Sequence, residues 1–252
     1  MTFKLFAALL VTVTLILPGK AARARDVSTI VIGYGEWPPF ESGSLPQLGP
    51  VPALVAAAFA SGGTHVDFKS LPWWRMLHEL ETGNLDGALI WRDVGGRRAK
   101  FLLSDPIFNS QISLFYRENE VRPWTKLSDL STLKIGATTS YRYCPEFDRL
   151  EAQGRLKVER AAADELNFSK LLARRIDAMI VDSEYGHWRL AHQGESGGKI
   201  VEDKHEVCTV PMYMLISREI KYGPELTERF NAGLRQLKND GRFDRLLGDL
   251  QH

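Results

Sequence analysis

The sequence has only two cysteines, no excess of charge and, after its first residues, no long apolar run. Lys and Arg number 32 against 31 Asp and Glu, which gives a formal net charge of +1. Without a basic excess, the composition gives no indication of a nucleic-acid partner. No segment after the N-terminus approaches the roughly 20 consecutive apolar residues that a transmembrane helix requires. We therefore expect the rest of the chain to form soluble α/β structure.

The histidines show none of the spacings typical of a metal site. They are His65, His78, His187, His192, His205 and His252. Metal sites bring ligands together at short, regular separations, which these six positions lack. We accordingly expect no metal, no other cofactor and no catalytic residue. Glu36 and Asp93 keep acid–base catalysis open as an alternative.

The first residues have the pattern of a secretory signal peptide. Lys4 precedes an apolar run at residues 5–17, and small residues follow at Ala22 and Ala24. This order of charge, apolar core and small residues predicts cleavage after Ala24, so that residues 1–24 are removed and the protein is exported to the periplasm. The alternative is a membrane anchor, for which thirteen apolar residues are too few.

The two cysteines are Cys144 and Cys208. An even number of cysteines in an oxidising compartment permits one disulfide. Spacing alone does not show that they meet, so two unpaired thiols remain the alternative.

Expected strands alternate with expected helices along most of the chain. The strands are expected at residues 29–33, 66–70, 86–90, 111–116, 134–137, 156–160, 178–181 and 206–217, and the main helices at 52–60, 73–83, 145–153, 164–173, 183–192, 224–240 and 241–250. Alternation of this kind predicts mostly parallel sheets with helices on both faces. Two such series, joined by extended segments near 111–117 and 207–217, predict an α/β fold of two lobes between which the chain crosses twice. The expected ranges are 25–114 and 209–252 for the first lobe and 115–208 for the second.

Two adjacent arginines follow the expected strand at 86–90. Arg97 and Arg98 lie in a polar, Gly-rich segment, which we expect to be a turn. In α/β proteins ligands usually bind at the carboxyl edge of the sheet, where such a loop displays its side chains. A planar guanidinium meets a carboxylate through two parallel hydrogen bonds. The alternative is a solvated loop with a surface ion pair.

Several motifs together resemble one known family. They are WPPF, LPWWRMLHELETGNLDGAL, the arginine loop ending in LSDPIF, LSDLSTLKIGATTSYRY, LLARRIDAMIVD and LKNDGRFDRLL. In this order, and over nearly the whole chain after the signal peptide, they resemble the bacterial solute-binding proteins of family 3. The resemblance implies a two-lobe periplasmic-binding-protein fold of type II, with two hinge strands, that closes over one small ligand.

The resemblance also implies roles for individual residues. Arg97, or Arg98 if the alignment shifts by one residue, is expected to bind a ligand carboxylate, and Asp182 a ligand ammonium group. Capping of the following helix is the alternative role of Asp182. Trp37 and Trp73 match aromatic positions that stack on the ligand, with core packing as their alternative role.

Other positions depart from the family pattern. Trp91 stands where the family often has a small residue, so we expect it to narrow the pocket. Ser140 and Tyr141 belong to a loop, TTSYRY, that replaces a glycine–threonine pair, and they are expected to contact the ligand. Val94 replaces a common threonine. These departures leave the specificity for amino acids open.

The expected partners follow from the same resemblance. We expect a monomer that binds an amino acid or a small carboxylate and delivers it to the membrane permease of an ABC transporter. A sensor receptor in place of the permease, and an exported dehydratase-like enzyme on the same fold, are the alternatives.

Overall fold

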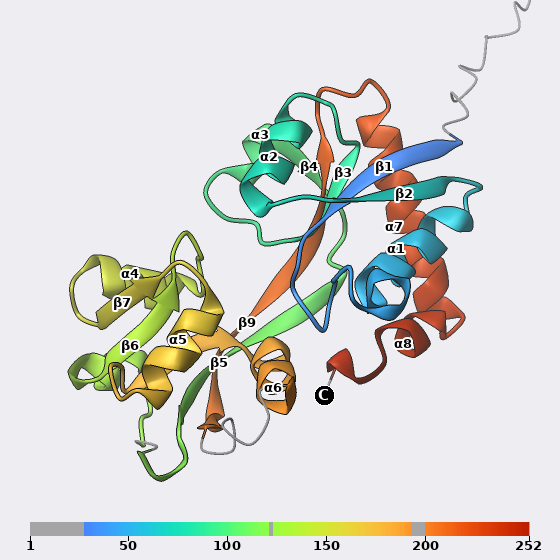
Figure 1. Cartoon of the computed structure of the whole chain (residues 1–252). Helices are drawn as coiled ribbons and strands as arrows, with labels where there is room; N and C mark the ends of the chain where they lie inside the picture. Colours follow the sequence, from blue (N-terminus) through green and yellow to red (C-terminus); the bar gives the residue numbers. More distant parts are fainter. Residues whose placement is uncertain (1–27, 121–122, 193–199, 252) are drawn as a thin grey trace, which may run out of the picture.

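The computed structural model describes residues 28–120, 123–192 and 200–251. The expected signal peptide lies outside these residues. Two lobes, each with its own sheet and helices, are joined by a pair of long strands (Figure 1). Within the described ranges, no helix combines the length and the apolar character needed to span a membrane.

The first lobe contains three parallel strands in the order β2-β1-β3. Its elements up to the crossing are β1 (Thr29–Tyr34), α1 (Pro50–Ala60), β2 (His65–Ser70), α2 (Trp73–Glu81), β3 (Gly87–Trp91), α3 (Arg97–Lys100) and β4 (Phe101–Leu103). Helix α2 buries Met76 and Leu80, which are four residues apart and therefore on one face. Trp74, on the opposite face, is 74% exposed. The segment expected as a polar turn contains the single-turn helix α3 instead.

The second lobe repeats this architecture with the strand order β8-β6-β7. Its elements are η3 (Leu127–Thr132), β6 (Lys134–Thr138), α4 (Pro145–Ala152), β7 (Lys157–Ala161), α5 (Asp164–Leu172), β8 (Ala178–Asp182) and α6 (Ser183–His192). Strand β8 is completely buried, as expected for a central parallel strand covered on both faces.

Strands β5 (Phe108–Arg117) and β9 (Ile200–Ser217) connect the lobes. They pair antiparallel from Phe108 opposite Met212 to Arg117 opposite Ile200. The C-terminal part of β9 also pairs with β3 and β4, whereas β5 pairs with β8 from Ile112 onwards. Both strands are longer than expected, and the expected lobe boundaries after residues 114 and 208 fall inside them. The prediction of a two-lobe α/β fold with two hinge strands is confirmed.

The C-terminal helices return to the first lobe. Helix α7 (Gly223–Asn239) packs along α1, and the rings of Phe59 and Phe230 lie 5.4 Å apart. Gly233 allows this close approach, because a Cβ atom there would lie 2.0 Å from the carbonyl oxygen of Ala58. Helix α8 (Arg242–Leu247) follows and also contacts α1.

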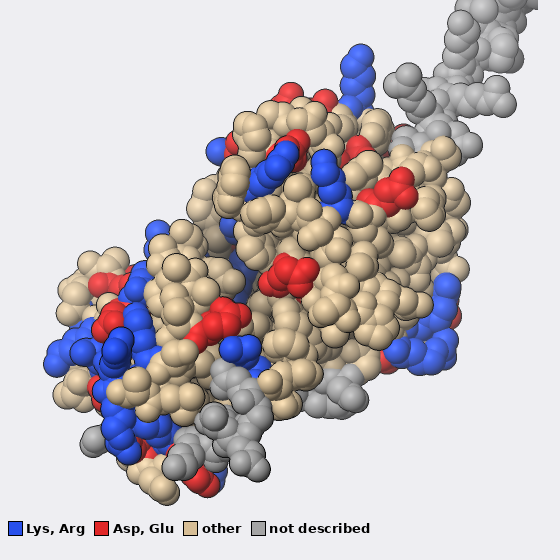
Figure 2. Space-filling model, viewed as in Figure 1, with Lys and Arg blue, Asp and Glu red and all other residues tan. Residues whose placement is uncertain are grey.

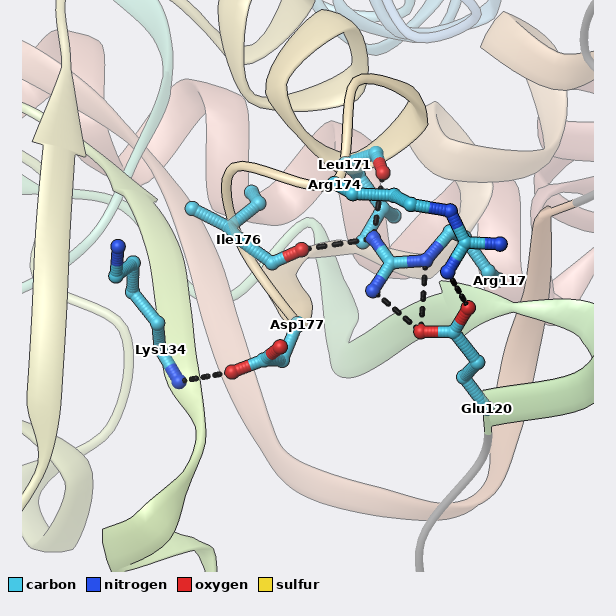
Figure 3. Close-up of polar contacts among 7 residues, drawn as sticks. All are labelled: Arg117, Glu120, Lys134, Leu171, Arg174, Ile176 and Asp177. Atoms are coloured by element: carbon cyan, nitrogen blue, oxygen red, sulfur yellow. Dashed lines mark hydrogen bonds and ion pairs between the residues drawn. The ribbon is translucent and has the colours of Figure 1, made fainter.

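A buried arginine closes the second lobe at the end of β5. Figure 3 shows the Arg117 guanidinium donating to the carbonyl oxygens of Leu171, at 2.5 Å, and Ile176, at 2.8 Å, and pairing with Glu120 at 2.6 Å. Arg174 pairs with the other oxygen of Glu120. Arg117 is 8% exposed. Its hydrogen bonds tie the turn between α5 and β8 to the hinge strand.

We expect Arg117→Met to lower the free energy of unfolding by about 3 kcal/mol, because it removes the charged donor from two buried carbonyl oxygens. Arg174→Met is the matched control, since it removes an exposed arginine from the same carboxylate and should cost less than about 1 kcal/mol. Urea unfolding followed by circular dichroism measures both changes. Equal losses in the two variants would show that the buried bonds contribute nothing beyond the ion pair.

Candidate functional site

The first-lobe wall of the site is built around two tryptophans and one arginine. Trp73 begins α2 and Trp91 ends β3, and their rings meet edge to face with centroids 5.2 Å apart. The Arg97 guanidinium carbon lies 4.8 Å from the centre of the Trp91 ring. An arginine over an aromatic face is held by cation–π attraction. The structure therefore brings three of the predicted ligand residues into one cluster.

Arg97 retains free hydrogen-bond donors. Among the residues that the structure describes, the only hydrogen bond of its guanidinium runs from Nη1 to the carbonyl oxygen of Arg92, at 2.7 Å. Partial burial lowers the pKa of Arg97, and the adjacent positive charge of Arg92 acts in the same direction. A guanidinium nevertheless keeps its charge at neutral pH and has five N–H donors. Arg97 thus presents an incompletely satisfied cation.

Arg98 lies in a different environment. It is exposed, forms an ion pair with Asp93 and lies over the ring of Tyr213 at 5.8 Å. Its guanidinium therefore already has a carboxylate partner. The geometry favours Arg97 over Arg98 as the cation available to a ligand.

Trp37 packs away from the Trp73 cluster. It is 7% exposed, its ring lies 4.5 Å from that of Phe40, and Phe40 in turn stacks on Phe108 of the hinge strand at 5.0 Å. The backbone of the same loop covers part of Trp73, because a Cβ atom on Gly35 would lie 2.6 Å from that ring. The aromatic loop thus connects the first lobe to the hinge.

On the second lobe, the predicted ligand loop follows β6. Ser140 is exposed and adopts a left-handed backbone conformation with φ of 68°, and Tyr141 is half-buried. Both line a surface hollow of about 370 Å³ together with Arg160. Arg160 donates to the carbonyl oxygens of Thr138, at 2.5 Å, and Tyr141, at 3.1 Å. These bonds hold the two ends of the loop together.

A disulfide ties the same loop to the hinge. Cys144, directly after the loop, is bonded to Cys208 of β9, with the Cα atoms 6.3 Å apart. Cys208 faces Ile112 in the β5–β9 ladder. The loop that carries Ser140 and Tyr141 is therefore covalently fixed to a strand that crosses between the lobes.

Asp182 ends β8 beside the hinge and is 3% exposed. Its Oδ1 accepts the backbone N–H of Tyr185 at 2.9 Å, and its Oδ2 accepts the Ser110 hydroxyl at 2.5 Å. Burial raises the pKa of Asp182, while these hydrogen bonds act in the opposite direction. The carboxylate thus caps α6, and the backbone N–H of Glu184 adds a third hydrogen bond to it.

Asp182 also lines a cavity of about 410 Å³ at the hinge. Phe40 and Phe108, Ser110, and Lys238 and Phe243 of the C-terminal helices belong to the same lining. Trp73, Trp91 and Arg97 do not. On the side shown in Figure 2, a furrow separates the two lobes, and Lys and Arg side chains gather on the second lobe.

Two further acids lie on the second-lobe side and were not singled out from the sequence. Asp164, 5% exposed, accepts the Thr138 hydroxyl at 2.5 Å, and burial raises its pKa to about 6. Glu165 accepts the Tyr185 hydroxyl at 2.5 Å. We call Asp164, Glu165 and Asp182 the acidic wall. In the sequence, Asp164 and Glu165 form an Asp-Glu pair at the start of an expected helix. Acidic residues are common at this position, so the pair did not indicate that Asp164 is buried.

Arg92 is the other residue that sequence reasoning missed. It directly follows β3, and its Nη1 donates to the carbonyl oxygen of Arg142 at 2.6 Å. Arg142 belongs to the second lobe.

In the described part of the chain, no three His, Cys, Asp or Glu residues are grouped so as to hold a metal ion.

Comparisons with known proteins agree with this architecture. The sequence model of the bacterial extracellular solute-binding proteins, family 3, matches residues 30–249. The chain belongs to this family. The resemblance predicted from its motifs is confirmed, although no curated protein sequence matches the chain.

Solved structures of related architecture share only about a fifth of their residues with it. An ancestral arginine-binding protein bound to arginine superposes with a TM-score of 0.70 at 20% identity, covering 87% of this chain and 96% of the other. A histidine kinase sensor domain similar to periplasmic binding proteins gives 0.73 at 20%, with coverage of 88% and 96%. An ancestral amino acid-binding protein, a precursor of cyclohexadienyl dehydratase, gives 0.69 at 21%, with coverage of 87% and 93%. These similarities establish the fold.

The aromatic loop of the first lobe also holds a buried acid that makes stability depend on pH. Glu41 is fully buried; its Oε1 accepts the N–H of Gly35 at 2.8 Å, whereas Oε2 is buried without a partner among the described residues. Burial raises the pKa of Glu41 from 4.5 to about 8. Between these values the folded protein keeps a proton that the unfolded chain has released.

We therefore expect the free energy of unfolding to fall as pH rises from about 4.5 to about 8, with Glu41 contributing up to about 1.4 kcal/mol per pH unit. Glu41→Gln should remove this contribution. Glu36→Gln, an exposed change in the same loop, is the control. Urea unfolding at several pH values measures the slopes, and an unchanged slope in Glu41→Gln would contradict a neutral Glu41 in the folded state.

Proposed function

We propose that the protein is an exported solute-binding protein that captures an amino acid, or a related small carboxylate, between its two lobes. The observation that carries this proposal is the placement of opposite charges across the hinge. Arg97 on the first lobe has free donors, and Asp182 on the second lobe is a buried carboxylate that lines a cavity. The zwitterion of an amino acid has a carboxylate that can bind Arg97 and an ammonium group that can bind Asp182.

The aromatic residues support binding of a small molecule at this place. The edge-to-face pair of Trp73 and Trp91 excludes water from one side of Arg97. Charge-assisted hydrogen bonds gain strength where water is excluded. The carboxylate of a ligand bound here is therefore held more firmly than by an exposed arginine such as Arg98.

Binding is coupled to closure because the ligand contacts both lobes. Strands β5 and β9 form the only paired connection between the lobes in the described residues, so bending there moves one lobe relative to the other. A ligand that bridges Arg97 and Asp182 interacts more strongly with the closed than with the open arrangement. Its differential affinity shifts the population toward closure.

The closed protein then acts as a monomer in the periplasm and delivers its ligand to the membrane permease of an ABC transporter. This role is supported by the family to which the chain belongs. A sensor receptor as partner remains a second possibility, in line with the fold shared with a histidine kinase sensor domain. Copurification with a permease or with a sensor kinase distinguishes the two.

One observation favours a second candidate function, acid–base catalysis. Asp164 is buried in the acidic wall with a pKa of about 6, which suits a general acid or base near neutral pH. A structural neighbour is a precursor of a cyclohexadienyl dehydratase. Incubation with a prephenate-like acid tests this candidate, since a dehydratase releases an aromatic product that absorbs in the ultraviolet.

A thermal-shift screen of amino acids, small carboxylates and amines identifies the ligand, because a bound ligand raises the melting temperature with its concentration. For a carboxylate-bearing hit, we expect Arg97→Ala to weaken binding about 10- to 100-fold, the loss of a charge-assisted pair. Arg98→Ala, the adjacent arginine paired with Asp93, should change affinity about twofold or less. Titration calorimetry compares them, and the reverse order would assign the carboxylate to Arg98.

Asp182→Asn tests the opposite anchor, because the amide keeps an acceptor for the helix cap and removes the negative charge. We expect it to weaken binding of an amine-bearing hit about 10-fold or more and to leave an acid without an amine unaffected. The melting temperature of the variant controls for folding. Equal weakening of both ligands would show that Asp182 supports the site without contacting an ammonium group.

A further inference from the structure

Arg92 leaves β3 at an irregular point of the sheet. Ile90 has a φ of 54°, a left-handed conformation that is rare for a β-branched residue. The register of β3 against β9 also shifts there: Ala88 pairs with Leu215 but Trp91 pairs with Tyr213, so β3 contains one extra residue. Such a bulge changes the direction of the side chains that follow it. The first lobe thus presents Arg92 at its edge.

From this edge Arg92 reaches the other lobe. Besides its 2.6 Å bond to the Arg142 carbonyl, its guanidinium carbon lies 5.9 Å from the centre of the Tyr143 ring. Both contacts are with the segment that Arg160 and the Cys144–Cys208 disulfide hold in place. Arg92 therefore forms a hydrogen bond from the first lobe to a fixed carbonyl group of the second lobe.

The charge of Arg92 acts on both walls of the site. On the second lobe, burial raises the pKa values of Asp164 and Asp182, and Arg92 opposes this rise for each. On the first lobe, Arg92 lowers the pKa of Arg97, which burial lowers more. The charge of Arg92 is consequently close enough to interact with both the proposed carboxylate anchor and two carboxylates of the acidic wall.

We infer that Arg92 is a specificity-determining residue that bridges the lobes and offsets the acidic wall, so that the cleft favours a ligand with one carboxylate and one amine over a ligand with an additional positive charge. This inference rests on the proposed function. Without Arg92, Asp164 and Asp182 of the acidic wall lack a cation that the opposite lobe supplies. An additional ammonium or guanidinium group on the ligand then supplies the positive charge that Arg92 supplied to the acidic wall.

The bridging contact also bears on closure without ligand. A hydrogen bond between lobes exists only while they are close together, so it stabilises the closed arrangement. Because its donor is charged, it is stronger than a neutral hydrogen bond. Removing Arg92 should therefore open the ligand-free protein.

The test compares wild type, Arg92→Gln and Arg142→Gln, each with the disulfide intact and freed of bound ligand by unfolding and refolding. Arg142→Gln removes a neighbouring exposed arginine side chain and keeps the carbonyl group that Arg92 bonds. The probes for calorimetry are L-glutamine and L-arginine, which share the α-carboxylate and α-amine and differ by one positive charge. Small-angle X-ray scattering measures the radius of gyration without ligand.

We expect the ratio of affinities to shift about 10-fold or more toward L-arginine in Arg92→Gln, and to stay within about twofold in Arg142→Gln. The radius of gyration should increase only in Arg92→Gln. An unchanged ratio in Arg92→Gln, where wild type binds either probe, would overturn the assigned selectivity. If wild type binds neither probe, the assigned selectivity between them is overturned, while the thermal-shift screen still tests the proposed function on its own. The bridging role is tested by scattering, and an unchanged radius of gyration in Arg92→Gln overturns it.

Discussion

The backbone hydrogen bonds between β5 and β9 are the constraint on which the rest of this molecule depends. These strands pair from Phe108 to Arg117 on β5, with register shifts near Ser113, and each lobe adds its remaining strands to them. A buried backbone N–H or C=O group without a hydrogen-bond partner destabilises the fold. The two strands therefore resist separation. The lobes can bend about this ladder while their own packing is preserved.

The proposed site depends on this constraint, because it has anchors of opposite charge on the two lobes that the ladder joins. Asp182 lies opposite Ile112 in the β5–β8 ladder and accepts a hydrogen bond from Ser110 of the hinge strand. The disulfide at Cys208 fixes the second-lobe loop to the other hinge strand. Arg97 and Arg92 extend from the first lobe beyond β3. Asp182 is therefore held at the hinge, while the two arginines belong to the other lobe.

Much of the fold could be predicted from the sequence because it follows from local patterns. Alternation of β-branched runs with amphipathic segments identified most strands and helices, and the match of RRIDAMIVD identified Asp182 at the end of a strand. The lengths of β5 and β9 were underestimated, since residues 200–205 and 108–110 lack the apolar pattern of a buried strand. These residues are in strands because their backbone groups pair with distant partners: residues 108–110 pair with 210–212, and residues 200–202 pair with 115–117.

Residue identity and order alone specify the family, the two-lobe α/β architecture and the candidate anchors, because hydrophobic periodicity and motif order are properties of the linear chain. Only the tertiary structure distinguishes Arg97, stacked on Trp91 with free donors, from Arg98, paired with Asp93. It alone also reveals Arg92 and Asp164, which resemble ordinary surface residues in the sequence. Burial and charge pairing depend on groups distant in the chain, here 50 residues between Arg92 and Arg142 and 26 between Thr138 and Asp164. Such contacts arise from packing of the whole fold, and no local pattern encodes them.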